Sequence, residues 1–169
     1  ELVGLVESFE YLRWTRRYNR CGSFELKAVA TDENIMLLQL GNILWLSSDE
    51  EAGIIEYVEM SRAEREIITV SGRFATSYLS RRIIWNTETL NGELSDCVEQ
   101  LLQNHIINPS EADRKMSFLH YINDNITGQV STQISYRNLM DAVNGLCEAS
   151  DVGIKTVFDT TTKVFTVRL

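Results

Sequence analysis

The side chains of this sequence that could do chemistry are two histidines, three cysteines and a short run of acids. His105 and His120 are far apart in the sequence, and no CxxC or HExxH spacing accompanies them, so the pattern does not fit a metal site. A histidine could also act as a general acid or base near neutral pH. His105 completes an apolar helical stripe and His120 follows Phe118 and Leu119, so we expect a helix-end histidine and a partly buried one.

The run Asp49, Glu50 and Glu51 could supply paired carboxylates, as glycoside hydrolysis requires, if a cleft held two of them at a defined separation. The run stands between two expected strands, which favours a hydrated hairpin tip. The sequence has no G-x-S-x-G, Walker or G-x-G-x-x-G pattern to present a nucleophile or cradle a phosphate. We therefore expect no catalytic, cofactor-binding or metal-binding residues, and a protein that is not an enzyme.

The cysteines Cys21, Cys97 and Cys147 are too few, and odd in number, for a disulfide framework. Cys97 and Cys147 fall on apolar faces of expected helices, where cysteine behaves as a small hydrophobic residue. We expect all three thiols to be reduced, as in a protein that folds in a cytosol.

Charge argues against nucleic-acid binding as the main function, because the formal net charge is −8 and polyphosphate binding leaves a basic footprint. Arginines do form two local groups, which are Arg13, Arg16, Arg17 and Arg20, and Arg81 and Arg82. In a strand, Arg13 and Arg17 would share one face while Arg16 and Arg20 share the other. This division favours a solvated or salt-bridged surface over a phosphate-binding strip.

Large aromatic residues crowd the first part of the chain, at Tyr11, Trp14, Tyr18 and Phe24, with Trp45 and Tyr57 further on. Such side chains could stack sugars or bases. Aromatic residues also dominate the burial in cores and subunit interfaces. We favour a β core or an inter-subunit seam for these residues.

The first half of the chain has the pattern of β structure. Residues 3–17 and the alternating run from Phe24 to Ala28 predict a long hairpin, with a turn in which Gly22 has a positive φ. The other elements expected in this half are a helix over 32–38 with Thr31 as its N-cap and Gly41 after its end, strands near 43–48, 53–61 and 65–72, and a turn at 61–65.

The second half mixes helices and strands. A polar stretch over 86–92 precedes a helix whose apolar stripe runs from Leu94 to His105. Further elements expected are a loop at 108–115, a strand at 129–135, a helix over 136–149 capped by Ser135, strands near 153–158 and 163–168, and a turn at 159–162. We predict an α+β fold with a β-rich, barrel-like domain over 1–90 and a smaller α+β domain over 91–169. Because the chain ends within a strand, we expect the native protein to continue beyond residue 169.

An ordered set of short motifs follows this plan: Trp14-Thr15-Arg16-Arg17-Tyr18-Asn19, Gly22, Phe24-Glu25-Leu26, Gly53-Ile54-Ile55-Glu56, Val70-Ser71-Gly72-Arg73, Arg81-Arg82-Ile83-Ile84, Gln133-Ile134-Ser135-Tyr136-Arg137-Asn138-Leu139 and Gly153. Taken together and over nearly the whole chain, these motifs resemble the siphovirus Gp thirty-seven-like family. The resemblance implies a tail or baseplate protein of long-tailed phages and prophages, similar to the tail hubs that join the tail tube to the tail tip.

The resemblance further implies a homotrimeric ring in the full-length protein, other tail or baseplate proteins as partners, and a place in the virion tail after synthesis in the bacterial cytoplasm from a prophage. It brings no catalytic residues. The motif positions it marks for assembly are Trp14, Arg16, Arg17, Tyr18, Gly22, Phe24, Gly72, Arg73 and Arg82. A negative wall would let DNA pass nearby without specific binding. The longest apolar runs, Ile35–Leu38 and Ile43–Leu46, are too short to span a membrane.

The alternative function is a host cell-surface carbohydrate-binding module of a tail tip, which would grip sugar through exposed aromatic residues. The two functions predict different surroundings for Trp14, Tyr18 and Trp45. Burial of these side chains favours the hub, and an exposed row along a groove favours sugar binding.

Overall fold

The computed structural model describes residues 3–62 and 65–169. The chain forms two compact units. The first consists of Gly22–Ala75 together with the segment that ends at Arg16, and the second of Arg17–Cys21 and Thr76–Leu169. The predicted division into domains at residue 90 stays a prediction, since these units are defined by packing and a domain by independent folding.

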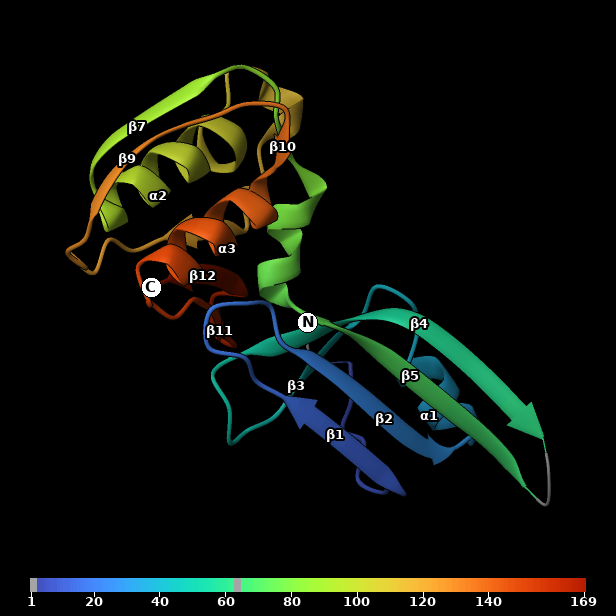
Figure 1. Ribbon diagram of the computed structural model, residues 1–169. Coiled ribbons are helices and arrows are strands. Elements are labelled where there is room, and N and C mark those ends of the chain that lie inside the picture. The colour runs from blue at the N-terminus through green and yellow to red at the C-terminus, as the bar shows by residue number, and fades with distance from the viewer. Residues whose placement is uncertain (1–2, 63–64) are drawn as a thin grey trace. The chain divides into compact units, whose positions relative to one another are not determined.

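The first unit is built on one antiparallel sheet, which curls like half of a barrel (Figure 1). Its strands are β1 (Tyr11–Thr15), β2 (Ser23–Val29), β3 (Ile43–Trp45), β4 (Ala52–Arg62) and β5 (Glu66–Phe74), in the spatial order β1-β2-β5-β4-β3. The alternation in β2 buries Phe24, Leu26 and Ala28 in the core of this unit. The predicted α+β class with a barrel-like β half is confirmed.

The short helix of this unit forms where the sequence predicts it. Helix α1 (Asp32–Leu37) has Thr31 as its N-cap, and the Thr31 hydroxyl accepts a hydrogen bond of 3.2 Å from the Asn34 N–H. Asp32 adds negative charge at the positive end of the helix. After the helix, Gly41 has a φ of +86°, a conformation that glycine adopts without steric cost.

Two predictions for the first hairpin are wrong. Strand β1 begins only at Tyr11, and residues 3–9 form neither helix nor strand. Gly22 does not have a positive φ, because among the described glycines only Gly41, Gly92 and Gly128 do. The strand predicted over 43–48 stops at Trp45. The predicted turn at 61–65 includes Ala63 and Glu64, which lie outside the described residues.

The second unit combines helices with short strands. Its helical segments are the 3₁₀ helix η1 (Ala75–Arg81), α2 (Leu94–Leu102), the π-helical turn η2 (Gln103–Ile107), the 3₁₀ turn η3 (Ala112–Arg114) and α3 (Leu139–Ala149). Its strands are β6 (Ile83–Ile84), β7 (Glu88–Glu93), β8 (Leu119–Tyr121), β9 (Gln129–Ile134), β10 (Arg137–Asn138), β11 (Lys155–Asp159) and β12 (Val164–Arg168).

These strands form small sheets around the two main helices. Strand β12 pairs antiparallel with β11 and parallel with β8, and β6 pairs with β10. Strands β7 and β9 form a two-stranded ribbon that arches over α2 (Figure 1). Within the described part of the chain, no helix is long and apolar enough to cross a membrane.

The helices α2 and α3 bury the apolar stripes that the sequence predicts, including Val98 and Leu101 on α2 and Val143 on α3. Cys97 and Cys147 lie on these buried faces, Cys21 is buried in the segment before β2, and none of the three is in a disulfide bond. Burial raises the pKa of the Cys147 thiol to about 12, and burial together with the nearby Asp96 carboxylate also raises the pKa of Cys97. The structure shows no disulfide bond at these three residues, and their reduced state stays a prediction.

Two elements of the second unit differ from the prediction. The polar stretch predicted over 86–92 forms most of β7, because each of its residues from Glu88 onward lies opposite a β9 partner and Leu90 is fully buried. Helix α3 begins at Leu139 instead of 136, and its N-cap is Asn138, not Ser135. The Asn138 side chain accepts a hydrogen bond of 3.0 Å from the Met140 N–H.

Candidate functional site

The residues of the first motif meet in an aromatic cluster on the curled sheet. The Trp14 indole packs against the rings of Phe24 and Phe74, with centroid separations of 5.7 and 4.6 Å. Its Nε1–H donates a 3.0 Å hydrogen bond to the Asp49 carboxylate. Trp14 lies directly opposite Phe24 across β1 and β2, so the strand register itself places one of these contacts.

Glycines make room for this aromatic cluster. A Cβ on Gly22 would lie 2.5 Å from the Phe74 ring and 2.6 Å from the Thr15 carbonyl oxygen, and a Cβ on Gly53 would lie 2.3 Å from the Phe24 ring. A Cβ on Gly72 would lie 1.8 Å from the Ile54 carbonyl oxygen, next to the register shift between Ile55 and Tyr57 in β4. The Trp-Gly-Phe motif therefore reflects close packing, and not the turn conformation predicted for Gly22.

The acidic run between β3 and β4 is not the hydrated tip that the sequence predicts. The side chains of Asp49 and Glu51 are almost fully buried, and only Glu50 is exposed. Asp49 accepts the Trp14 N–H and also the Glu51 backbone N–H, at 3.0 Å each. Arg16 lies with its Nε 3.5 Å from the Glu51 carboxylate. The run thus joins the loop to the aromatic cluster.

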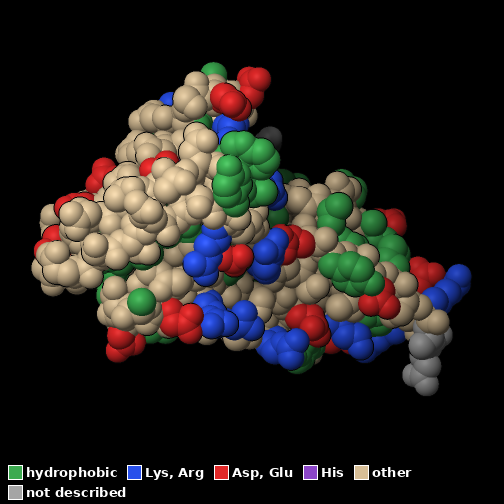
Figure 2. Space-filling view, turned by 45° about the horizontal axis from the view of Figure 1, so that its top comes forward, with side chains coloured by type: hydrophobic (Ala, Val, Ile, Leu, Met, Phe, Trp, Pro, Cys, Tyr) green, Lys and Arg blue, Asp and Glu red, His purple; other side chains and the backbone are tan. Residues whose placement is uncertain are grey.

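Two other arginines of the sheet, the motif residue Arg73 and the non-motif residue Arg13, are paired with acids. Arg73 binds both carboxylate oxygens of Glu56 at 2.7 and 2.8 Å, and Arg13 pairs with Glu25 at 3.0 Å. Strand β1 ends at Thr15, so the predicted strand with Arg13 and Arg17 on one face and Arg16 and Arg20 on the other does not form. The expected salt-bridged surface does occur, and Figure 2 shows acidic and basic side chains interspersed on the face drawn.

Within the second unit, residues 17–21 are held against the loop that follows α3. The Tyr18 hydroxyl donates to the Asp151 carbonyl at 3.1 Å, and the Tyr18 carbonyl accepts from Ile154 at 2.8 Å. A Cβ on Gly153 would lie only 2.8 Å from the Cε2 atom of the Tyr18 ring. Arg20 pairs with Glu148 at 3.0 Å. Gly153 is thus required for close approach.

The last motif arginine, Arg82, connects the turn η3 to the start of α3 within the second unit. Its Nε and Nη2 donate to the Arg114 carbonyl at 3.0 and 2.6 Å, while its own carbonyl accepts the Leu139 N–H at 2.9 Å. Burial, together with the nearby positive charges of Arg114 and Arg81, lowers the pKa of Arg82 below its usual value. Arg82 therefore fixes the entry into α3 and does not present a free charge. Arg17 is also used locally, donating to the Cys21 carbonyl at 3.2 Å.

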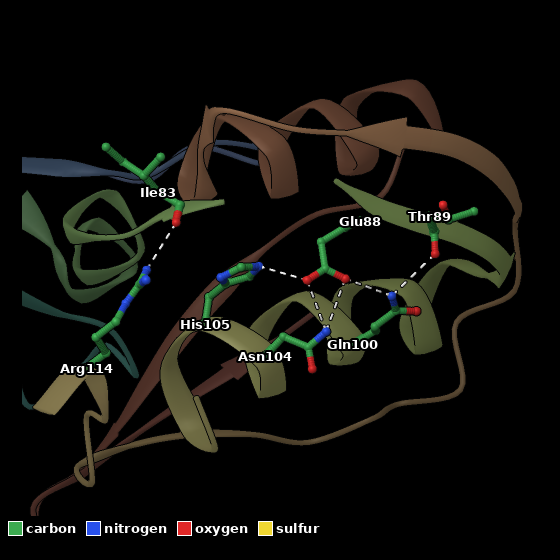
Figure 3. Close-up of polar contacts among 7 residues, drawn as sticks. All are labelled: Ile83, Glu88, Thr89, Gln100, Asn104, His105 and Arg114. Atoms are coloured by element: carbon green, nitrogen blue, oxygen red, sulfur yellow. Dashed lines mark hydrogen bonds and ion pairs between the residues drawn. The ribbon is translucent and has the colours of Figure 1, made fainter. Parts of the chain in front are cut away.

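The arrangement closest to a catalytic pair is formed by Glu88 on β7 and His105 in η2 (Figure 3). The His105 Nε2 lies 3.2 Å from the Glu88 carboxylate, without hydrogen-bond alignment. The same carboxylate accepts hydrogen bonds from the side-chain amides of Gln100 and Asn104, at 3.1 to 3.2 Å. Glu88 therefore has its oxygens occupied by neighbours on α2 and η2.

Burial lowers the pKa of His105, and the Arg114 charge acts in the same direction, while Glu88 partly opposes both. His105 is buried, as expected for a histidine that completes an apolar helical stripe. The amides of Gln100 and Asn104 therefore join β7 to α2 and η2, with the His105 imidazole buried beside the Glu88 carboxylate. The other histidine was predicted wrongly, because His120 on β8 is exposed and not partly buried.

The aromatic residues that could have gripped a sugar differ in exposure. Trp14 is half-buried in the cluster, while Tyr18 is 65% exposed with its hydroxyl bonded to Asp151. Trp45 is partly exposed and donates its Nε1–H to the Asp49 carbonyl at 3.1 Å. The expected burial is therefore met in part by Trp14 and fails for Tyr18 and Trp45, which are exposed. Across residues 3–62 and 65–169, no group of three His, Cys, Asp or Glu side chains could hold a metal ion.

Comparison with known protein families finds a match that extends over the whole sequence. The family described as Siphovirus ReqiPepy6 Gp37-like protein matches residues 1–169. The chain belongs to this Gp37-like family. No curated protein sequence matches the chain.

Solved structures with the same fold give the Gp37-like chain a structural context. A prophage tail protein gp18 from Listeria monocytogenes has a TM-score of 0.60 at 12% identity, over 96% of this chain and 45% of that one. The Escherichia coli protein c3393, described as a type VI secretion component structurally similar to T4 tail proteins gp27 and gp5, has a TM-score of 0.56 at 13% identity, over 99% and 47%. A tail protein of prophage MuSo2 from Shewanella oneidensis has a TM-score of 0.51 at 16% identity, over 93% of this chain and 49% of that one.

In this Gp37-like chain, the motif residues divide between the two units. Trp14, Gly22, Phe24 and Gly72 lie in or beside the aromatic cluster, whereas Tyr18 and Arg82 belong to the second unit. Sequence reasoning missed Phe74 and Gly53 as members of the cluster. No local sequence signal marks them, because Gly53 and Phe74 meet only as cross-strand partners of β4 and β5.

Proposed function

We propose that this chain is part of a structural protein of a phage or prophage tail, at the hub or baseplate where the tail tube meets the tail tip. The observation that carries the proposal is the fold of the entire chain. Both units together correspond to tail proteins from two bacteria and to a secretion-system protein, over 93 to 99% of this chain. The chain spans about half the length of each of those structures, so the role proposed is that of a larger protein.

The curled sheet supports a place in a ring. Its two edge strands, β1 and β3, each pair on one side only, and Tyr11, Ile43 and Trp45 on them are exposed. An unpaired edge invites pairing with another chain, and cyclic symmetry closes such edges in a finite assembly. The proposed partners are copies of the full-length chain in a homotrimer and other tail or baseplate proteins. The proposed location is the virion tail, after synthesis in the bacterial cytoplasm.

The charge of the chain suits passage of DNA without binding. The net charge is −8, and the motif arginines are paired with acids or bonded to carbonyls. Acidic walls repel phosphate, so a DNA strand passing nearby would not be held. We further propose that the chain catalyses no reaction, because the Glu88 carboxylate beside His105 is occupied by side-chain amides.

The proposal is tested by labelling intact particles. A small peptide tag would be placed on this protein in the phage or prophage that encodes it, and gold-labelled antibody would be located by electron microscopy. We expect label at the tip-proximal end of the tail, and none on untagged particles. Label on the capsid, or absence of the protein from purified particles, would contradict the tail role.

A further inference from the structure

Strand β9 has an unused edge. It pairs with β7 along one side, and within the described residues its opposite side makes no backbone hydrogen bonds. The residues Ser131, Thr132 and Gln133 on β9 are exposed. An unpaired edge of this kind presents a row of N–H and C=O groups to which an extended peptide can add.

A groove of about 670 Å³ runs along this edge, and α3 forms its other side. Small residues of α3 face the groove, namely Ala142, Gly145 and Ala149. A Cβ on Gly145 would meet only the Arg137 Nη2, at an ordinary 3.6 Å. Small side chains opposite a free strand edge leave space for the main chain of an incoming strand.

The groove has a single charged lining residue, which follows an exposed tyrosine in the sequence. Arg137 is the charged residue among those lining the groove, in a chain whose net charge is −8. Next to it, Tyr136 is 75% exposed and lies edge-on to Trp85, which is 62% exposed, with 6.0 Å between ring centroids. Tyr136 has a φ of +50°, a strained conformation for a bulky residue. Exposed aromatic residues beside an arginine are typical of binding hot spots.

The N-terminal segment of the same chain has the properties of a strand that would fit. Residues 3–9 form no helix or strand, although they are rich in apolar residues. Gly4 packs closely on Leu37 of α1, while Val3 and Leu5 on either side are 67% and 70% exposed. The exposed large apolar residues Val3, Leu5 and Phe9 all stand at odd positions, which would share one face of an extended strand. Glu7 supplies a negative charge to match Arg137.

We propose that the groove between β9 and α3 binds residues 3–9 of a second copy of this chain as an added β-strand. The β9 edge supplies main-chain hydrogen bonds, Arg137 pairs with Glu7, and Tyr136 and Trp85 contact the exposed apolar side chains of the segment. The binding is a property of the isolated chain and does not depend on a role in a tail.

The first test measures binding of a fluorescent peptide with the sequence of residues 3–10 to the purified chain, by anisotropy. We expect saturable binding that weakens at least about tenfold in Gly145→Leu, which fills the groove from the helix side. The Gly145→Leu chain should fold, because leucine favours helix more than glycine does and the site has room. No binding up to roughly 1 mM peptide, or equal binding to both proteins, would overturn the proposal.

The second test identifies the occupant by a charge exchange. Sedimentation velocity should show concentration-dependent association of the wild-type chain, and weaker association of Arg137→Glu alone and of Glu7→Arg alone. A mixture of the two variants should recover association, because the acid introduced into the groove of one variant faces the base introduced into the segment of the other. Wild-type chain that stays monomeric while the peptide binds would mean that a different strand fills the groove, and would overturn the second-copy assignment.

Discussion

The ring centroids of Trp14 and Phe74 lie 4.6 Å apart, although their strands, β1 and β5, are separated in the sheet by β2. Side chains two strands apart meet in this way when the sheet curls strongly around the cluster. The contact therefore links the first family motif to the curvature of the β unit. The ring proposed above would use that curvature, so we predict that the packing of these two residues affects assembly.

Removing the Phe74 ring should destabilise the β unit substantially. Phe74 is fully buried and contacts Trp14, so Phe74→Ala leaves a cavity and should lower the free energy of unfolding by about 3–5 kcal/mol. Urea unfolding followed by tryptophan fluorescence measures the change. The matched control is Tyr57→Ala on β4, where the side chain is exposed and the expected change is within about 0.5 kcal/mol. Equal effects of the two substitutions would contradict the cluster as the centre of the unit.

Adding a single methyl group at Gly22 should also destabilise the fold, for a steric reason. The new Cβ in Gly22→Ala would lie 2.5 Å from the Phe74 ring and 2.6 Å from the Thr15 carbonyl oxygen, so we expect a loss of about 1–3 kcal/mol by urea unfolding. In Gly145→Ala the methyl group has room and helix propensity improves, so stability should stay equal or rise by up to about 1 kcal/mol. A neutral Gly22→Ala would refute the close packing.

The sequence predicted the elements whose signals are local. The cap of α1 at Thr31, the apolar stripes of α2 and α3, and the alternation in β2 each follow from a few neighbouring residues, and each is present. Strand β7 could not be predicted in this way, because Glu88, Thr89 and Asn91 are polar and the strand forms through its pairing with β9, far along the chain. Tertiary contacts override local preference at such places.

The same limit applies to the site residues. The sequence marked Trp14, Gly22 and Phe24, but it suggested a turn role for Gly22, since glycine in a turn is the commoner local pattern. The true reason is the ring of Phe74, a residue that β2 and β5 bring beside Gly22 through long-range pairing. Likewise Asp49 and Glu51 are acids in a loop by sequence, and only the fold shows that the Trp14 indole and Arg16 hold them.

The oligomeric state should differ between this chain and the full-length protein. A ring needs edge strands such as β1 and β3 closed by neighbours, and a protein as long as the matched structures would add contacts to the interface. A stable specific interface buries roughly 1,200–2,000 Å² in total. We expect light scattering to give a trimer mass for the full-length protein and only weak, concentration-dependent association for residues 1–169. A full-length protein that stays monomeric at high concentration would count against the ring.

The stability of the second unit should depend on pH through His105. Burial lowers the pKa of His105 in the folded state below its ordinary value of 6.5, so the unfolded chain binds more protons between the two pKa values. Stability therefore rises with pH through this window, is fully present above about pH 6.5, and is lost as the pH falls toward the folded-state value. The unfolding free energy of the wild-type chain should be lower at pH 5 than at pH 7.5.

The variant His105→Gln should flatten this pH dependence, because glutamine does not titrate. The matched control is His120→Gln on β8, an exposed position, which should keep the wild-type slope. Asp124, whose pKa the hydrogen bond from Arg168 lowers, contributes only at more acidic pH, since its stabilisation is present above its ordinary value of 3.8. Urea unfolding at a series of pH values separates the two windows. An unchanged slope in His105→Gln would show that the Glu88–His105 contact is not linked to the stability of this unit between pH 5 and 7.5.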